Sequence, residues 1–124
     1  MKSYVDKINK ITSDNVNFRK VLFTTSLSQL VVMRLKAGEE IGSEVHHDID
    51  QFIRVESGEG KAVLSGQKHH LKAGYAVVIP AGVEHNVINT SNEKELKLYT
   101  IYTPPEHPAG TIHATKADAD AAEH

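Results

Sequence analysis

The chain alternates apolar and polar residues over many short segments, which glycine, asparagine, serine and aspartate separate. Alternation with a period of two is typical of strands that bury one face, and closely spaced turn residues favour a sandwich or a barrel. The pattern predicts strands at 18–25, 29–36, 44–47, 51–57, 60–65, 68–72, 75–79, 85–90 and 96–103. We therefore expect an all-β fold.

The two ends of the chain differ from this pattern. Apolar residues at helical spacing predict a short N-terminal helix over 3–12. A Pro104-Pro105 pair ends the last strand because proline cannot continue a strand ladder. The alanine-rich, charged end is expected to form a short exposed helix or to be disordered. The expected parts are a flanking segment, a barrel and a tail, at 1–14, 15–104 and 105–124.

Alternation predicts some inward faces and leaves others open. Val31, Met33 and Leu35 alternate on one strand and are expected to line the core. In the last strand, two leucines compete with Tyr99 and Ile101 for the inward face, so either face can point inward. A Ser-Gly-Gln turn at 65–67 predicts a hairpin over 60–72.

Composition narrows the function. The 124 residues suffice for one domain, and a formal net charge of −2 gives no basic surface for nucleic acid or an anionic membrane. Neither a bilayer-spanning apolar run nor a signal peptide is present, so we expect a cytoplasmic protein. Because there is no cysteine, a metal site must use imidazole and oxygen ligands, and eight histidines are available.

Proline and glycine place one histidine at the start of a strand. Pro80 ends the preceding apolar strand, since proline cannot donate to the ladder, and Gly82 can take the positive φ that the turn requires. His85 then opens the next alternating segment. A histidine on a rigid sheet is well placed to be a metal ligand, with a structural role as the alternative.

Three polar residues upstream favour a common site. Glu44 and His46 are two residues apart, so on a strand both side chains would project from one face. Gln51 opens the next strand after a short turn and can fold back toward them. Two imidazoles and one carboxylate suit a divalent first-row metal and leave positions open for water or substrate. We therefore predict a metal site formed by Glu44, His46, Gln51 and His85.

These residues also occupy two motifs by which the chain resembles a small single-domain bacterial cupin. The first motif, G(X)5HXH(X)3,4E(X)6G, matches in spacing throughout, with Glu44 in place of the first histidine and Gln51 in place of glutamate. The second motif, G(X)5PXG(X)2H(X)3N, is met in full by Gly74, Pro80, Gly82, His85 and Asn89. The resemblance covers roughly residues 15–103.

The resemblance implies a double-stranded β-helix, a jelly-roll barrel with a divalent metal (Mn, Fe, Ni or Zn) inside it. The two exchanged residue types keep one carboxylate in the set, so the net ligand charge equals that of the usual His-His-Glu-His set. The alternative is a metal-free barrel that keeps these residues for packing or sugar binding. Val31, Met33, Ile53, Val55 and Val77 are expected to make the pocket mostly apolar beyond the ligands.

Three functions are open to such a site. The first is a metal-dependent isomerase or lyase acting on a small oxygen-rich metabolite such as a sugar acid, with Glu44 as a candidate catalytic base. The second is an Fe- or Mn-dependent dioxygenase, and the third is a non-catalytic sugar-binding or sensing barrel. The fold alone does not choose among them. Barrels of this kind often pair through their outer sheet, so we also expect a homodimer.

Other polar residues have simpler expected roles. His47 should point away from His46 into solvent, and Asn89 should form structural hydrogen bonds rather than bind metal. His107 and His113 lie in a segment rich in proline and glycine, where a loop could cover the end of the barrel.

Overall fold

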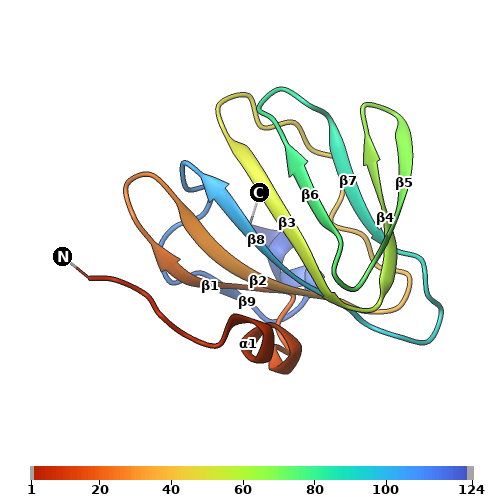
Figure 1. Cartoon of the computed structure of the whole chain (residues 1–124), viewed down its shortest axis with the longest axis horizontal. Helices are drawn as coiled ribbons and strands as arrows, with labels where there is room; N and C mark the ends of the chain where they lie inside the picture. Colours follow the sequence, from red (N-terminus) through yellow and green to blue (C-terminus); the bar gives the residue numbers. More distant parts are fainter. Residues whose placement is uncertain (1, 123–124) are drawn as a thin grey trace.

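The computed structural model describes residues 2–122, which form two antiparallel sheets and two short helices. The elements are α1 (Ile8–Asp14), β1 (Arg19–Thr24), β2 (Gln29–Leu35), β3 (Asp50–Ser57), β4 (Glu59–Leu64), β5 (Gln67–Lys72), β6 (Ala76–Ile79), β7 (His85–Asn89), β8 (Leu96–Thr103), β9 (Ile112–His113) and α2 (Lys116–Ala122). The larger sheet has the order β6–β3–β8–β2–β1–β9 and the smaller sheet the order β5–β4–β7 (Figure 1). The predicted all-β class is confirmed.

The core lies between the inner faces of the two sheets. Val31, Met33 and Leu35 on β2 have no exposed surface, which confirms the alternation on this strand. From the smaller sheet, Ala62 and Val87 are also buried and belong to the same apolar cluster. Each sheet therefore buries the apolar half of its alternating pattern against the other sheet.

The structure identifies the inward face of β8, which alternation left open. β8 lies between β2 and β3 in the larger sheet, and Thr100 is opposite Val31 on one side and Ile53 on the other. Residues paired across a sheet share a face, so Thr100 points inward with its two buried partners. Tyr102, two residues along the strand, therefore also faces the interior, where it is 4% exposed.

The predicted hairpin over 60–72 is formed by β4 and β5. Leu64 pairs with Gln67, so only Ser65 and Gly66 form the turn. Both turn residues have positive φ, 49° and 83°, as in the two-residue turns that match the twist of a hairpin.

The predicted strand at 44–47 is wrong. Glu44 forms one isolated bridge with His85, and the chain then leaves the sheet. The carbonyl of His46 accepts a hydrogen bond of 2.8 Å from the backbone N–H of Gly82, in the turn before β7. At this point the backbone of His46 bonds to a turn and not to a neighbouring strand, and the segment is irregular.

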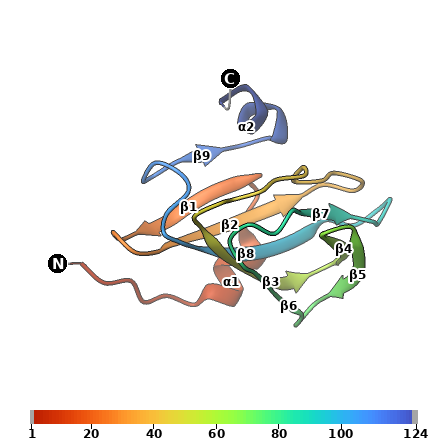
Figure 2. The same ribbon diagram turned by 90° about the horizontal axis from the view of Figure 1, so that it is seen from above.

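The terminal segments lie on opposite sides of the larger sheet (Figure 2). The N-terminal helix begins at Ile8 rather than residue 3, and Tyr4 instead packs its ring against Phe23 at a centroid distance of 5.7 Å. The unpredicted strand β9 pairs with β1 at the edge of this sheet, and α2, on the other side from α1, buries Ala119 in the core. The charged, alanine-rich end thus forms a short helix that is mostly exposed apart from Ala119, while residues 123–124 lie outside the described residues. Within residues 2–122, neither helix is long and apolar enough to cross a membrane.

Candidate functional site

His85 lies at the start of β7 and is held in one orientation. Its side chain is buried, and its Nδ1–H donates to the backbone carbonyl of Val83 at 2.9 Å. This bond places the ring proton on Nδ1, so Nε2 carries the free lone pair. The backbone of His85 also exchanges two hydrogen bonds of 2.9 Å with the backbone of Glu44. Position 44 is therefore fixed against position 85.

Glu44 and His46 lie next to each other and next to His85. The carboxylate Oε2 of Glu44 is 3.3 Å from Nε2 of His46. The imidazole rings of His46 and His85 have centroids 5.2 Å apart. Sequence spacing predicted that Glu44 and His46 share a strand face. They lie side by side although the segment is not a strand.

Gln51 begins the inward-facing row of β3 and is 4% exposed. Its Nε2 donates to the hydroxyl of Thr100 at 3.0 Å, whereas its Oε1 is buried and accepts no hydrogen bond. Gln51 is opposite Tyr102 in the ladder, and the Tyr102 ring packs edge-on to His46 at a centroid distance of 6.1 Å. Gln51 therefore shares this end of the barrel with the two imidazoles.

The side chains are close, but they are not arranged as a closed metal cluster. Among residues 2–122, no three or more His, Cys, Asp or Glu side chains are grouped so as to hold a metal ion as they stand. In the structure, the Glu44 carboxylate contacts His46 directly. Gln51 is not one of these four residue types, so its amide oxygen does not count toward such a group.

The sequence analysis missed Glu106, which faces the same imidazole from the C-terminal segment. Oε2 of Glu106 is 3.5 Å from Nδ1 of His46, so a carboxylate lies near each ring nitrogen. The Pro104-Pro105 pair indicated only that the strand ends before this residue. No local pattern indicates that the following loop returns over the open end of the barrel.

His107 lies beside the site, with an aromatic ring between it and His46. Its ring packs edge-to-face on Tyr102 at a centroid distance of 5.3 Å. Burial, together with the nearby charges of Arg19, His113 and His46, lowers the pKa of His107 to about 3. His107 is therefore a neutral packing residue at neutral pH. His113 is on β9, where its Nδ1 is 3.3 Å from Nη1 of Arg19.

A pocket of about 490 Å³ opens at this end of the barrel. Polar side chains dominate its lining, which consists of Ile41, Gly42, Ser43, Glu44, Val45, His46, Glu106, Lys116 and Asp120. The expectation of a mostly apolar pocket is wrong. The residues predicted to line it, such as Val31 and Ile53, are completely buried in the core instead.

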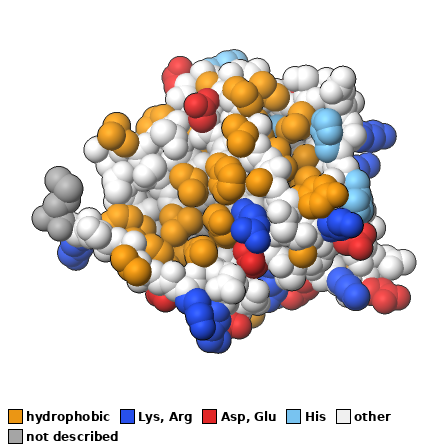
Figure 3. Space-filling view, viewed as in Figure 1, with side chains coloured by type: hydrophobic (Ala, Val, Ile, Leu, Met, Phe, Trp, Pro, Cys, Tyr) orange, Lys and Arg blue, Asp and Glu red, His pale blue; other side chains and the backbone are white. Residues whose placement is uncertain are grey.

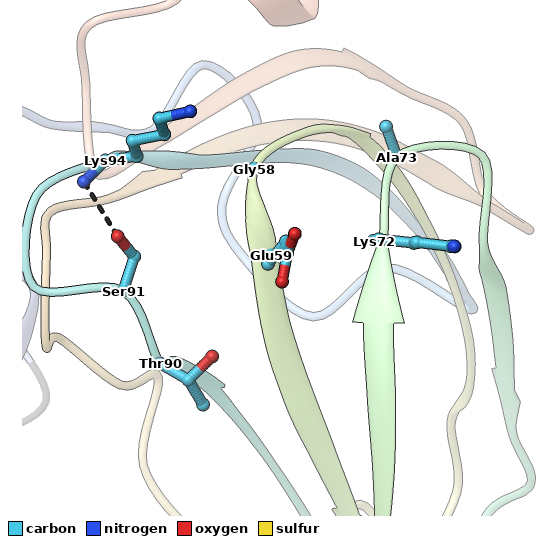
Figure 4. A pocket seen from close by; sticks show the side chains of 7 residues that line it. All are labelled: Gly58, Glu59, Lys72, Ala73, Thr90, Ser91 and Lys94. Atoms are coloured by element: carbon cyan, nitrogen blue, oxygen red, sulfur yellow. Dashed lines mark hydrogen bonds between the residues drawn. The ribbon is translucent and has the colours of Figure 1, made fainter.

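A second pocket, of about 570 Å³, lies at the opposite ends of β3 and β7 (Figure 4). Its lining includes Glu59, Lys72, Thr90 and Lys94, and the backbone N–H of Lys94 donates to Ser91 Oγ beside it. It contains no imidazole and none of the four predicted ligands. The predicted ligands therefore lie at the other end of the barrel.

The remaining polar predictions agree with the structure. His47 is exposed, while Asn89 is buried and bonds to backbone atoms. Its Nδ2 donates to three backbone carbonyls and its Oδ1 accepts from one backbone N–H. Asn89 is thus a structural residue at the end of the barrel opposite the candidate site.

The fold and the spacing of these residues agree with a comparison against protein families. The family model described as "Cupin domain" matches residues 31–102. The chain belongs to the cupin family. The matched range of this cupin contains the four predicted ligands and both motifs, whereas Glu106 lies beyond it.

Two proteins and one solved structure are similar to this cupin over most of its length. YrkC of Bacillus subtilis (strain 168) is 48% identical over 128 residues, covering 98% of this chain and 68% of YrkC. L612 of Acanthamoeba polyphaga mimivirus is 47% identical over 113 residues, covering 88% and 70%. The crystal structure of BH2720 from Bacillus halodurans has a TM-score of 0.94 and 43% identity, covering 97% of this chain and 95% of BH2720.

Proposed function

We propose that this cupin binds one divalent first-row metal ion through Glu44, His46, Gln51 and His85, and that it isomerises or cleaves a small oxygen-rich metabolite, such as a sugar or sugar acid, at this site. When bound, such an ion supplies Lewis-acid chemistry suited to isomerisation or elimination. The chain itself supplies the ligands, orients the imidazoles and forms the walls of the pocket.

The buried amide oxygen of Gln51 is the observation that carries the proposal. An acceptor buried without a donor destabilises a protein by about 1–3 kcal/mol. Gln51 Oε1 is in that position at the end of the barrel that holds both imidazoles. A cation bound there would give this oxygen a partner.

The orientation of His85 supports the same proposal. Histidine ligands commonly donate their second ring N–H to a carbonyl or carboxylate, which fixes the nitrogen that faces the metal. His85 donates Nδ1–H to Val83 in this way. Metal binding would exchange the present Glu44–His46 contact for contacts with the ion. Neutral imidazole, carboxylate and amide donors suit Mn, Fe, Ni or Zn.

The lining of the pocket supports a small polar ligand. Its volume of about 490 Å³ is within the usual range of 300–1,000 Å³ for small-molecule sites. Lys116 is the basic residue of the lining, and its Nζ is already 3.0 Å from Asp120. A lining of carboxylates, a serine and an imidazole favours a ligand with several hydroxyl groups over a phosphate ester, which would need a basic cluster.

Metal content tests the proposal directly. The full chain would be purified without added metal, then equilibrated with Mn, Fe, Ni or Zn and analysed by plasma mass spectrometry. We expect about one ion per chain in the wild type, strong loss in His85→Ala, and no loss in His47→Ala, which removes an exposed imidazole next to the site. A wild-type protein that retains none of these metals, or a His85→Ala variant that retains them fully, would refute the metal site.

Turnover tests the second part of the proposal. The metal-loaded protein would be incubated with a panel of uronic acids and followed by NMR for isomerisation or ring opening. Oxygen consumption by the Fe-loaded protein distinguishes a dioxygenase. Binding without turnover would show a sugar-binding or sensing barrel and refute the enzymatic part.

We also propose that the outer face of the larger sheet joins two copies of the chain. Apolar side chains gather on this face (Figure 3), where Phe52 is opposite Val78 and Ile101 on its neighbouring strands. Val78 is 67% exposed. Light scattering during gel filtration should give a dimer mass for the wild type and for Leu27→Glu, a control in an exposed turn, and a monomer mass for Val78→Glu. A monomeric wild type would contradict the homodimer.

A further inference from the structure

Glu106 is held in place by a buried glutamine on β2. Gln29 is 1% exposed, and its Oε1 accepts hydrogen bonds from the backbone N–H groups of Glu106 and His107 at 3.2 and 3.0 Å. Its Nε2 donates to the carbonyl of His107 at 2.7 Å and to the hydroxyl of Thr24 at 3.0 Å. One core side chain therefore positions the backbone on both sides of the Glu106–His107 peptide bond.

This position brings the Glu106 carboxylate to His46. Oε2 of Glu106 is 3.5 Å from Nδ1 of His46, a distance within ion-pair range and slightly longer than a hydrogen bond. The opposite ring nitrogen, Nε2, faces Glu44 at 3.3 Å. The His46 side chain is 10% exposed and the Glu106 side chain 30% exposed, so the contact is partly protected from water.

We propose that Glu106 is a positioning residue of the metal site: its carboxylate accepts a hydrogen bond from Nδ1–H of His46 and thereby presents Nε2 of that ring to the metal. The proposal rests on the metal site proposed above. It assigns to the C-terminal segment, which lies beyond the matched cupin domain, a direct influence on metal affinity. The neutral carbonyl of Val83 orients the His85 ring in the same way, by accepting a hydrogen bond from its Nδ1–H. For His46, the acceptor is the charged carboxylate of Glu106.

Two further observations support this assignment. The buried Gln51 Oε1 lacks a donor at the same end of the barrel, which points to a cation there independently of Glu106. In the pocket lining, Lys116 is paired with Asp120 at 3.0 Å and not with Glu106. The Glu106 carboxylate is therefore directed at the imidazole and not at the basic residue of the pocket.

Metal affinity in matched variants tests the proposal. Glu106→Gln and Asp120→Asn each remove one negative charge from the same pocket, but only Glu106 contacts His46. Loss of a carboxylate that orients a histidine ligand typically lowers metal affinity about 10–100-fold. Competition of the Zn-loaded full chain with a chelator should show a loss of that size in Glu106→Gln and a change below about twofold in Asp120→Asn. Equal affinities in the two variants would overturn the proposal.

Imidazole NMR adds a readout that a purely structural role would not move. In the Zn-loaded wild type, the long-range ¹H–¹⁵N spectrum should place zinc on Nε2 and the proton on Nδ1 of His46. Zinc on Nδ1 would overturn the proposal even if affinity fell. Melting temperatures of the metal-free variants should equal that of the wild type, and a large drop in Glu106→Gln would overturn the assignment in favour of a structural role.

The outcomes distinguish this proposal from the proposed function. A wild type that binds no zinc and no other divalent metal overturns both. A wild type that binds metal with an affinity unchanged by Glu106→Gln overturns only the role of Glu106 and leaves the metal site standing.

Discussion

Replacing Asn89 by alanine should destabilise the protein strongly, although the residue lies at the end of the barrel opposite the proposed metal site. Asn89 is 1% exposed, and its Nδ2 donates to the carbonyls of Leu35, Lys36 and Lys94 at 3.1, 3.1 and 2.8 Å. Its Oδ1 accepts from the backbone N–H of Ser91 at 3.0 Å. One side chain thus joins the end of β2, the end of β7 and the loop before β8.

The magnitude follows from these bonds. The Nδ2 group has two protons, so its three carbonyl contacts share a proton and count as about two full bonds. With the bond from Ser91, about three buried bonds at about 1 kcal/mol net each amount to about 3 kcal/mol. A domain of this size unfolds with about 5–15 kcal/mol in total. The Asn89→Ala variant should therefore lose a large fraction of its stability and unfold at a clearly lower urea concentration.

Urea titration followed by far-ultraviolet circular dichroism measures this loss. The free energy of unfolding is obtained by linear extrapolation for the wild type, Asn89→Ala and Asn92→Ala. Asn92 is an exposed asparagine in the same loop and should change stability by less than about 0.5 kcal/mol. If the free energy of unfolding of Asn89→Ala were less than about 1 kcal/mol below that of the wild type, the reasoning from the buried hydrogen bonds of Asn89 would be wrong.

Three further predictions concern pH, backbone geometry and ligand charge. Burial and nearby positive charges lower the pKa of His107 to about 3 in the folded chain. Between about pH 6.5 and pH 3, His107 is therefore protonated in the unfolded chain and neutral in the folded chain. The free energy of unfolding should therefore fall as the pH drops through this window, and it should fall less steeply in His107→Gln; parallel slopes in urea titrations at several pH values would contradict this. Gly58→Ala should lower the free energy of unfolding by more than about 3 kcal/mol, because the new Cβ would lie 2.3 Å from the Glu95 carbonyl oxygen. Gly66→Ala has open space around the new Cβ and a φ of +83°, so it should lower the free energy of unfolding by only about 1 kcal/mol. Similar losses of stability in thermal melts of the two variants would refute the steric argument. Gln51→Glu should raise metal affinity at least about tenfold, because it adds a carboxylate to the proposed ligands. It should lower the stability of the metal-free protein, because it buries a charge at a position that is 4% exposed. Chelator competition that shows no gain in metal affinity would count against Gln51 as a ligand.

The sequence by itself determined most of the strands and both cupin motifs, because these depend on local spacing. A period of two predicted the core face of β2, and a Ser-Gly pair with positive φ produced the β4–β5 hairpin. Both cupin motifs lie between Gly38 and Asn89, and their spacing alone indicates the fold. Each of these features involves residues close together in the chain.

Only the tertiary structure decided features that depend on contacts between distant residues. The inward face of β8 was decided by its partners on both sides, Val31 and Ile53. The segment at 44–47 forms one bridge to His85 and then bonds to the turn at Gly82 instead of to a neighbouring strand. Glu106 reached the site because Gln29, 77 residues earlier, accepts its backbone N–H. Hydrophobic periodicity describes one strand at a time, so it cannot report which distant segment covers the end of a barrel.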